Sequence, residues 1–204
     1  MKDLDRALAD ITAIRSQLAR GTEFRGYGPV TVAVTALIAI TAAALQAAFI
    51  TEPAATPFSY LALWIGMAAL AALITGAEMV ARTRRIHGGF ADDMLYAAVE
   101  QFIPAGVAGT LITVVIYRFA PDALSLLPGL WQIVFALGVF ASVRALPRGM
   151  FAVGVWYLAA GLATLALSQS APFSPYAMAA PFGIGQLVMA FVIYRATGEH
   201  DGEE

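Results

Sequence analysis

Residues 149–194 read GMFAVGVWYLAAGLATLALSQSAPFSPYAMAAPFGIGQLVMAFVIY and contain no Asp, Glu, Lys or Arg. A helix needs about 20 apolar residues to cross the hydrocarbon core of a bilayer, which is roughly 30 Å thick. This segment is therefore long enough for two crossings. The polar, proline-bearing sequence SQSAPFSP at Ser168–Pro175 is where the chain can turn between them.

Four further uncharged stretches precede this pair, at 26–51, 53–77, 101–117 and 123–143. The chain is also 60% hydrophobic and only 13% charged, far from the composition of a soluble domain. We therefore predict an all-α, polytopic integral membrane protein, built as a bundle of six transmembrane helices. The spans are expected near 28–50, 58–81, 95–117, 123–144, 150–168 and 175–195. The apolar runs are continuous rather than alternating, which argues against a transmembrane β-barrel.

The basic residues indicate how this bundle is oriented. All but one would lie on the same side of the membrane: Lys2, Arg6, Arg15, Arg20, Arg25, Arg82, Arg84, Arg85, Arg144, Arg148 and Arg195 on one side, Arg118 on the other. Basic residues are retained on the cytoplasmic side. We expect a multi-pass protein of the cytoplasmic (inner) membrane with both termini in the cytoplasm. The first 25 residues lack the apolar core of a cleavable signal peptide.

Three parts are predicted along the chain: a cytoplasmic amphipathic helix with its linker at 1–25, the transmembrane domain at 26–195, and an acidic cytoplasmic tail at 196–204. In the first part, apolar residues recur at three- and four-residue spacing and form one stripe. The stripe that we single out for partner binding is Leu4, Ile11, Ile14 and Leu18. Two interpretations stay open. The stripe rests on the membrane surface or the bundle, or it forms a short coiled coil with a partner or a second copy.

Two segments suggest an internal repeat. Pro104–Arg118 (PAGVAGTLITVVIYR) and Pro181–Arg195 (PFGIGQLVMAFVIYR) align without a gap and share their proline, a glycine and the final Val-Ile-Tyr-Arg. The third span runs outward and the sixth inward, as a 3+3 inverted repeat requires. In that case Pro104 and Pro181 are equivalent helix hinges. The competing interpretation is coincidence, because apolar helices draw on a small set of residues.

Carboxylates near the membrane give the candidate polar site. Glu78 lies near the cytoplasmic end of the second span, and Glu100, followed by Gln101, lies about one turn into the third. Ionisable residues within spans are costly and often functional. One interpretation is therefore a proton- or cation-linked site at Glu78, Glu100 and Gln101. The other is a salt-bridge network at the interface.

The residue types that are absent or rare exclude several kinds of catalytic and cofactor chemistry. The chain has no cysteine, its single lysine is Lys2, and its two histidines are His87 and His200, both outside the spans. Thiol catalysis, iron–sulfur clusters, a retinal Schiff base and haem held between two histidines are excluded. No catalytic, metal or cofactor motif is present. We expect no enzyme activity, no cofactor and no nucleic-acid partner.

Three functions remain after these exclusions. The first is a small transporter or channel-like protein with its site between the third and sixth spans. The second is a membrane-anchored regulatory or accessory subunit that binds a cytoplasmic partner through its N-terminal helix. The third, which the lack of a catalytic motif disfavours, is an enzyme acting on lipid through Asp92, Asp93, His87 and Glu100. Expected partners are the lipid bilayer and either a second copy or another membrane or cytoplasmic protein.

Overall fold

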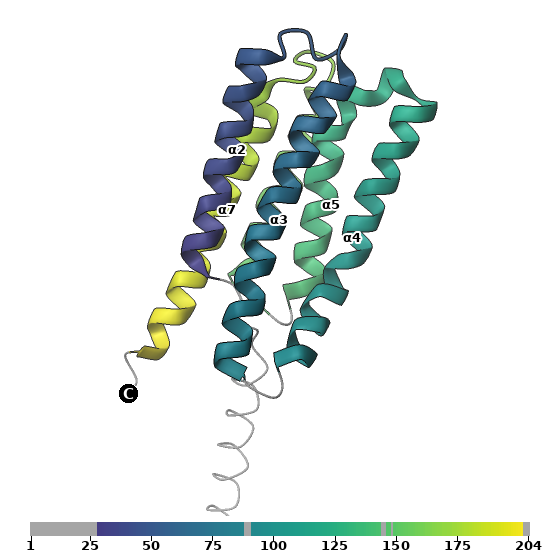
Figure 1. Cartoon of the computed structure of the whole chain (residues 1–204). Coiled ribbons are helices and arrows are strands. Elements are labelled where there is room, and N and C mark those ends of the chain that lie inside the picture. Colours follow the sequence, from purple (N-terminus) through teal and green to yellow (C-terminus); the bar gives the residue numbers. More distant parts are fainter. Residues whose placement is uncertain (1–27, 88–90, 144–145, 148, 202–204) are drawn as a thin grey trace, which may run out of the picture.

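The computed structural model describes residues 28–87, 91–143, 146–147 and 149–201, and every regular element in them is helical. The elements are α2 (Pro29–Phe49), α3 (Pro57–His87), α4 (Ala91–Phe119), the 3-10 helix η2 (Pro121–Leu126), α5 (Leu127–Ser142), α6 (Met150–Ala166) and α7 (Pro175–Asp201). Figure 1 shows them as one bundle of long, nearly parallel or antiparallel rods.

Five of these helices are long and apolar enough to cross a membrane: 29–49, 57–82, 100–119, 121–142 and 175–197. The sixth, α6, has 17 residues and so is about 26 Å long. Large apolar side chains such as Leu73, Leu111 and Phe191 are exposed on the outside of the bundle. A soluble monomer rarely exposes this many large apolar side chains, whereas lipid would cover them. The prediction of an all-helical, membrane-type fold is confirmed at this level.

Proline marks where several spans begin. Pro29, Pro57, Pro121 and Pro175 are the first residues of α2, α3, η2 and α7. Proline suits this position, because its fixed φ is already helical and its missing N–H is not needed in the first turn. Span starts predicted from the sequence therefore agree with the structure to within about two residues, except for the third span.

The segment between the second and third predicted spans, 82–94, is helical over most of its length instead of forming a loop, and the membrane-type part of α4 begins only at Glu100. α3 continues to His87 and α4 already begins at Ala91. Hydrophobicity alone ends a span where charges begin, but a helix can continue into water when its sequence allows it. Here no glycine or proline follows Gly76 before Gly88, and Asp92 and Asp93 suit a helix N-terminus.

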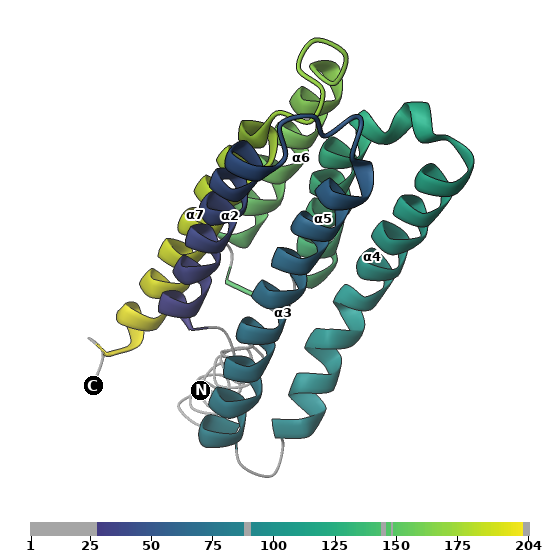
Figure 2. The same cartoon turned by 45° about the horizontal axis from the view of Figure 1, so that its top comes forward.

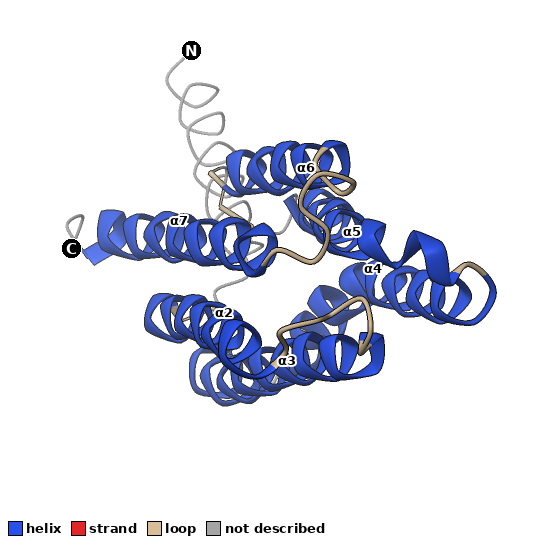
Figure 3. Ribbon diagram, turned by 90° about the horizontal axis from the view of Figure 1, so that it is seen from above, coloured by secondary structure: helices blue, strands red, loops and turns tan. Residues whose placement is uncertain are grey.

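Each helix packs beside its neighbours in a closed order, α2–α3–α4–α5–α6–α7 and back to α2. The most extensive pairs are α2 with α7 and α5 with α6. Figure 2 and the view from above in Figure 3 show the same order. We call the end with the connections 50–56 and 167–174 the upper end, as drawn in Figure 1, and the opposite end the lower end.

Glycines bring the backbones of α5 and α6 into contact. A methyl group on Gly129 would lie 2.8 Å from the carbonyl oxygen of Gly161, and one on Gly161 would lie 2.9 Å from that of Gly129. The two backbones therefore touch with no room for a side chain, as is common between membrane helices.

The interior holds two groups of buried apolar side chains. The upper cluster contains Ala42, Ala43, Tyr60, Leu61, Trp64, Leu124, Leu127, Phe173 and Met178. The lower cluster contains Val32, Ala136, Met150, Val153, Tyr157, Met189, Ala190 and Ile193. Aromatic rings also connect helices across the bundle, since Phe135 of α5 packs edge-on against Phe102, Tyr157 and Phe182.

Candidate functional site

Glu78, predicted as part of a polar site, lies against the beginning of α2. Its carboxylate touches Gly28, the residue that precedes α2, so closely that a methyl group at position 28 would overlap it. The first turn of a helix has unpaired N–H groups and the positive end of the helix dipole, and both favour a nearby carboxylate. Glu78 thus joins α3 to the start of α2 at the lower end.

The other predicted carboxylate has different surroundings. Glu100 is exposed on α4, while Gln101 is partly buried and its side-chain oxygen has no hydrogen-bond partner in the described structure. The buried Nε of Arg82 also lacks one there. Because Glu78 faces α2 and Glu100 is exposed on α4, the described residues do not form a shared carboxylate site.

The two predicted hinges also differ. Pro104 is exposed on the outside of α4, whereas Pro181 is buried within α7. The glycines that follow these prolines in the aligned segments differ in the same way. Gly106 faces open space, whereas a methyl group on Gly183 would lie 3.7 Å from the side chain of Ile40. α5 and α6 lie between α4 and α7 in the helix order. The predicted location between the third and sixth spans is therefore not a packed helix interface, and the inverted repeat stays a prediction.

Pro181 has a specific structural consequence inside the bundle. Proline has no N–H, so the carbonyl of Ala177, four residues earlier, loses its helical donor. Gln132 of α5, which is fully buried, donates its amide to that carbonyl at 2.8 Å. Trp156 of α6 donates its indole N–H to the Pro181 carbonyl at 2.9 Å. Two carbonyls of α7 next to this missing bond, those of Ala177 and Pro181, are thus bonded by side chains from two neighbouring helices.

A second set of polar contacts holds the upper end. Gln46 of α2 is 1% exposed, and its amide nitrogen donates to the carbonyl of Phe173 at 2.6 Å. The indole N–H of Trp64 donates to the side-chain oxygen of Gln46 at 2.7 Å. Together these bonds connect α2, α3 and the α6–α7 connection. Phe173 has a φ of 56°, in the left-handed region that residues other than glycine rarely adopt.

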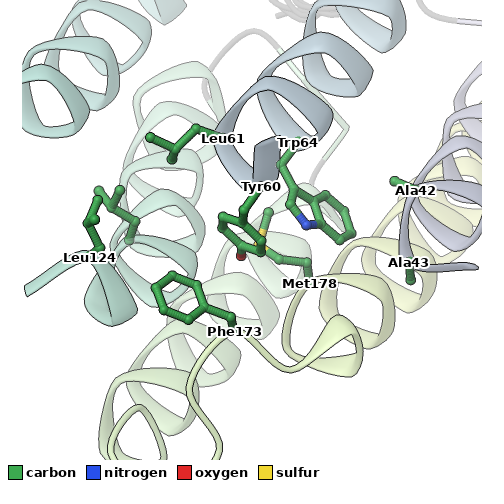
Figure 4. Close-up of a cluster of buried hydrophobic side chains, with 9 residues drawn as sticks. Ala42, Ala43, Tyr60, Leu61, Trp64, Leu124, Phe173 and Met178 are labelled. Atoms are coloured by element: carbon green, nitrogen blue, oxygen red, sulfur yellow. The ribbon is translucent and has the colours of Figure 1, made fainter. Parts of the chain in front are cut away.

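Tyr60 lies at the centre of this region. Its ring packs edge-on against Phe173, with ring centroids 5.0 Å apart, and its hydroxyl is buried with no hydrogen-bond partner in the described structure. Figure 4 shows Tyr60, Trp64, Phe173 and Met178 converging from α3, the α6–α7 connection and α7. The sulfur of Met178 is 4.0 Å from the amide nitrogen of Gln132, so the two sets of contacts are adjacent.

We call these side chains the upper polar group: Gln46, Tyr60, Trp64, Gln132 and Thr164, whose hydroxyl is 3.4 Å from the side-chain oxygen of Gln132. They come from α2, α3, α5 and α6, and none is charged. None of these five residues was among the site residues predicted from the sequence. Tyr60 and Trp64 were missed, because aromatic residues near the end of a span usually mark the membrane interface.

Several predicted residues fall outside the description. Leu4, Ile11, Ile14 and Leu18 lie outside the described residues, and the side chains of Asp92, Asp93 and His87 are likewise not described. Within the part of the chain that the structure describes, no three His, Asp or Glu side chains could share a metal ion.

No protein-family model, curated protein or solved structure matches this chain.

Proposed function

We propose that this chain is a small multi-pass transporter or channel-like protein. The observation that carries the proposal is the helical hydrogen bond that α7 lacks at Pro181, where the Ala177 carbonyl is bonded instead by a buried side chain of another helix. Substrate sites of many membrane transporters are built at interrupted helices, where backbone groups become available to a ligand. Irregular backbone within a span is tolerated only inside protein or beside a polar cavity.

This proposal moves the site away from the place that the sequence suggested. Glu100 and Pro104 are exposed on α4, so they do not line the interior. The buried polar groups instead gather between α2, α3, α5, α6 and α7 in the upper half. The proposed orientation remains that of the sequence: the inner membrane, with the lower end and both termini in the cytoplasm.

Flux through proteoliposomes tests the proposal. Purified protein reconstituted in liposomes would be exposed to gradients of urea, glycerol, K⁺ and protons, with light scattering and dyes as readouts. We expect Gln132→Leu to lower the flux of the transported solute, because it removes the donor at Ala177. Pro104→Ala is the matched control and should leave flux unchanged. If no gradient dissipates faster than in protein-free liposomes, the proposal is refuted.

The second candidate is a membrane-anchored regulatory or accessory subunit. The stripe Leu4, Ile11, Ile14 and Leu18 favours it, because such a stripe can bind a partner helix. Affinity capture from membranes, with the full-length protein and with a variant lacking residues 1–20, distinguishes the two candidate functions. An accessory subunit should lose its cytoplasmic partner on deletion, whereas a transporter should keep its flux.

A further inference from the structure

Phe173 occupies an unusual position for a residue in a surface connection. It lies in the short α6–α7 connection, yet its side chain is only 9% exposed and enters the upper cluster. Its carbonyl accepts from Gln46, and its ring packs on Tyr60. The left-handed φ is unfavourable for phenylalanine. Strained residues of this kind persist where the surroundings hold them, and they concentrate at ligand clamps and switch regions.

Beside Phe173 lies a donor without an acceptor. Tyr60 is 0% exposed, and its hydroxyl has no partner among the described residues. A buried polar group that lacks a hydrogen bond is costly, so such a group in a native structure calls for an explanation. In Figure 4 the Tyr60 ring lies beside Phe173 and Met178. The neighbouring polar groups, Gln46 and Gln132, already have partners.

The chemistry of the surroundings limits what could bind there. The five spans around this region carry no charged residue within 29–49, 57–77, 123–142, 150–166 and 175–194. A charged ligand would lose its hydration without gaining a countercharge, which is prohibitive in an apolar interior. A small uncharged molecule with a hydrogen-bond acceptor would accept a hydrogen bond from the Tyr60 hydroxyl. Its loss of hydration would cost much less than that of a charged ligand.

We infer that the space occupied by Phe173 and Met178 is the binding site of a small uncharged solute, whose acceptor group receives the Tyr60 hydroxyl. Phe173 closes this site from the upper end, and the α6–α7 connection must lift to admit the solute. The inference rests on the proposed transport function and names its solute class and its gate. Release of the connection breaks one side-chain hydrogen bond, from Gln46, and separates one pair of aromatic rings.

The absence of cysteine from the chain makes the closure directly measurable. Met178→Cys, buried beside Tyr60, would be labelled in nanodiscs with the small uncharged reagent methyl methanethiosulfonate and followed by mass spectrometry. We expect Phe173→Gly to raise the labelling rate at least tenfold. Glycine adopts the left-handed φ readily, so this variant removes the side chain and keeps the backbone. Phe58→Ala, which removes an exposed ring at the same end, should leave the rate unchanged.

A second cysteine variant reports on the fold as a whole. Ala136→Cys, buried in the lower cluster, should stay unlabelled in the Phe173→Gly background. An unchanged labelling rate of the Met178→Cys variant would overturn the inference. So would equal acceleration in both cysteine variants, because Phe173 would then hold the fold together rather than close a site.

Flux tests the role of Tyr60 separately. With urea as the probe, Tyr60→Phe should lower permeability at least fivefold, and Phe173→Gly should raise it. If urea permeates and Tyr60→Phe changes nothing, the assignment of the hydroxyl is wrong. If the protein without substitutions gives no flux but labelling of the Met178→Cys variant depends on Phe173, the transport function fails and the closed site is supported.

Discussion

Gln132 hydrogen-bonds the Ala177 carbonyl, which Pro181 leaves without a donor within α7. Replacing Gln132 with leucine, alone and together with Pro181→Ala, tests whether this is the main structural role of Gln132. Leucine is close to glutamine in size and removes the bond to Ala177 at 2.8 Å and the longer one to Thr164 at 3.4 Å. When alanine replaces Pro181, the helix regains an N–H that can bond the same carbonyl. The two substitutions should therefore be strongly non-additive.

The expected energies follow from these contacts. Hydrogen bonds between membrane helices contribute about 0.6 kcal/mol on average and up to about 1.7 kcal/mol. Leaving a buried acceptor unpaired costs about 1–3 kcal/mol. Gln132→Leu should thus destabilise the wild-type bundle by about 1–2 kcal/mol. In the Pro181→Ala background the carbonyl is paired within α7, and the cost should fall below about 0.5 kcal/mol. The coupling energy is then about 1 kcal/mol.

Denaturation in mixed detergent micelles measures the four members of this cycle. The reporters are the three tryptophans Trp64, Trp131 and Trp156, all inside helices of the bundle. Pro104→Ala serves as the control partner, because Pro104 is exposed on α4 and should add to Gln132→Leu without coupling. Additivity of Gln132→Leu with Pro181→Ala, to within about 0.4 kcal/mol, would refute the reasoning.

Three further predictions concern single positions. Gly129→Ala should destabilise the bundle by about 1–3 kcal/mol, since the methyl group would press on a backbone carbonyl of α6. Gly106→Ala, in open space, should be neutral or stabilising, and the unfolding midpoints of the two variants test this difference. Gly28→Ala should lower the melting temperature by overlapping the Glu78 carboxylate, and adding Glu78→Ala should restore it; no recovery would contradict this contact. Gln46→Leu should reduce amide protection in the connection 167–174, measured by hydrogen exchange, and unchanged protection there would count against the bond.

The sequence predicts the fold well because its strongest signals are local. Uncharged stretches and prolines give the position of each span, and both depend only on neighbouring residues. The lengths of α3 and α4 were underestimated, since hydrophobicity reports where lipid ends and not where hydrogen bonding along the helix ends. The 3-10 helix before α5 was missed for a similar reason, because Pro121–Leu126 carries no periodic pattern.

The candidate site was predicted less well, because the hydrophobicity of a span does not indicate which of its faces packs against other helices. Between 101 and 117 α4 has no charged residue that would mark a polar face, so nothing there indicates that Glu100 and Pro104 are exposed while Gln101 is partly buried. The free carbonyl at Ala177 does follow from Pro181 by simple counting along the helix. Its donor, Gln132, comes from a different span, and only the packing of α5 against α7 identifies it.

The pairing of α2 with α7 has a consequence for how the chain is made. The inner face of α2, with Val32, Ala36 and Ala39 buried, has α7 as its most extensive neighbour, and α7 follows four other helices in the sequence. At about 5–20 residues per second, a ribosome needs on the order of ten seconds to produce the intervening chain. During that interval α2 lacks its most extensive packing neighbour. Membrane insertion of the early helices is therefore separated in time from closure of the bundle, and a nascent chain that stops before α7 lacks the principal partner of its first span.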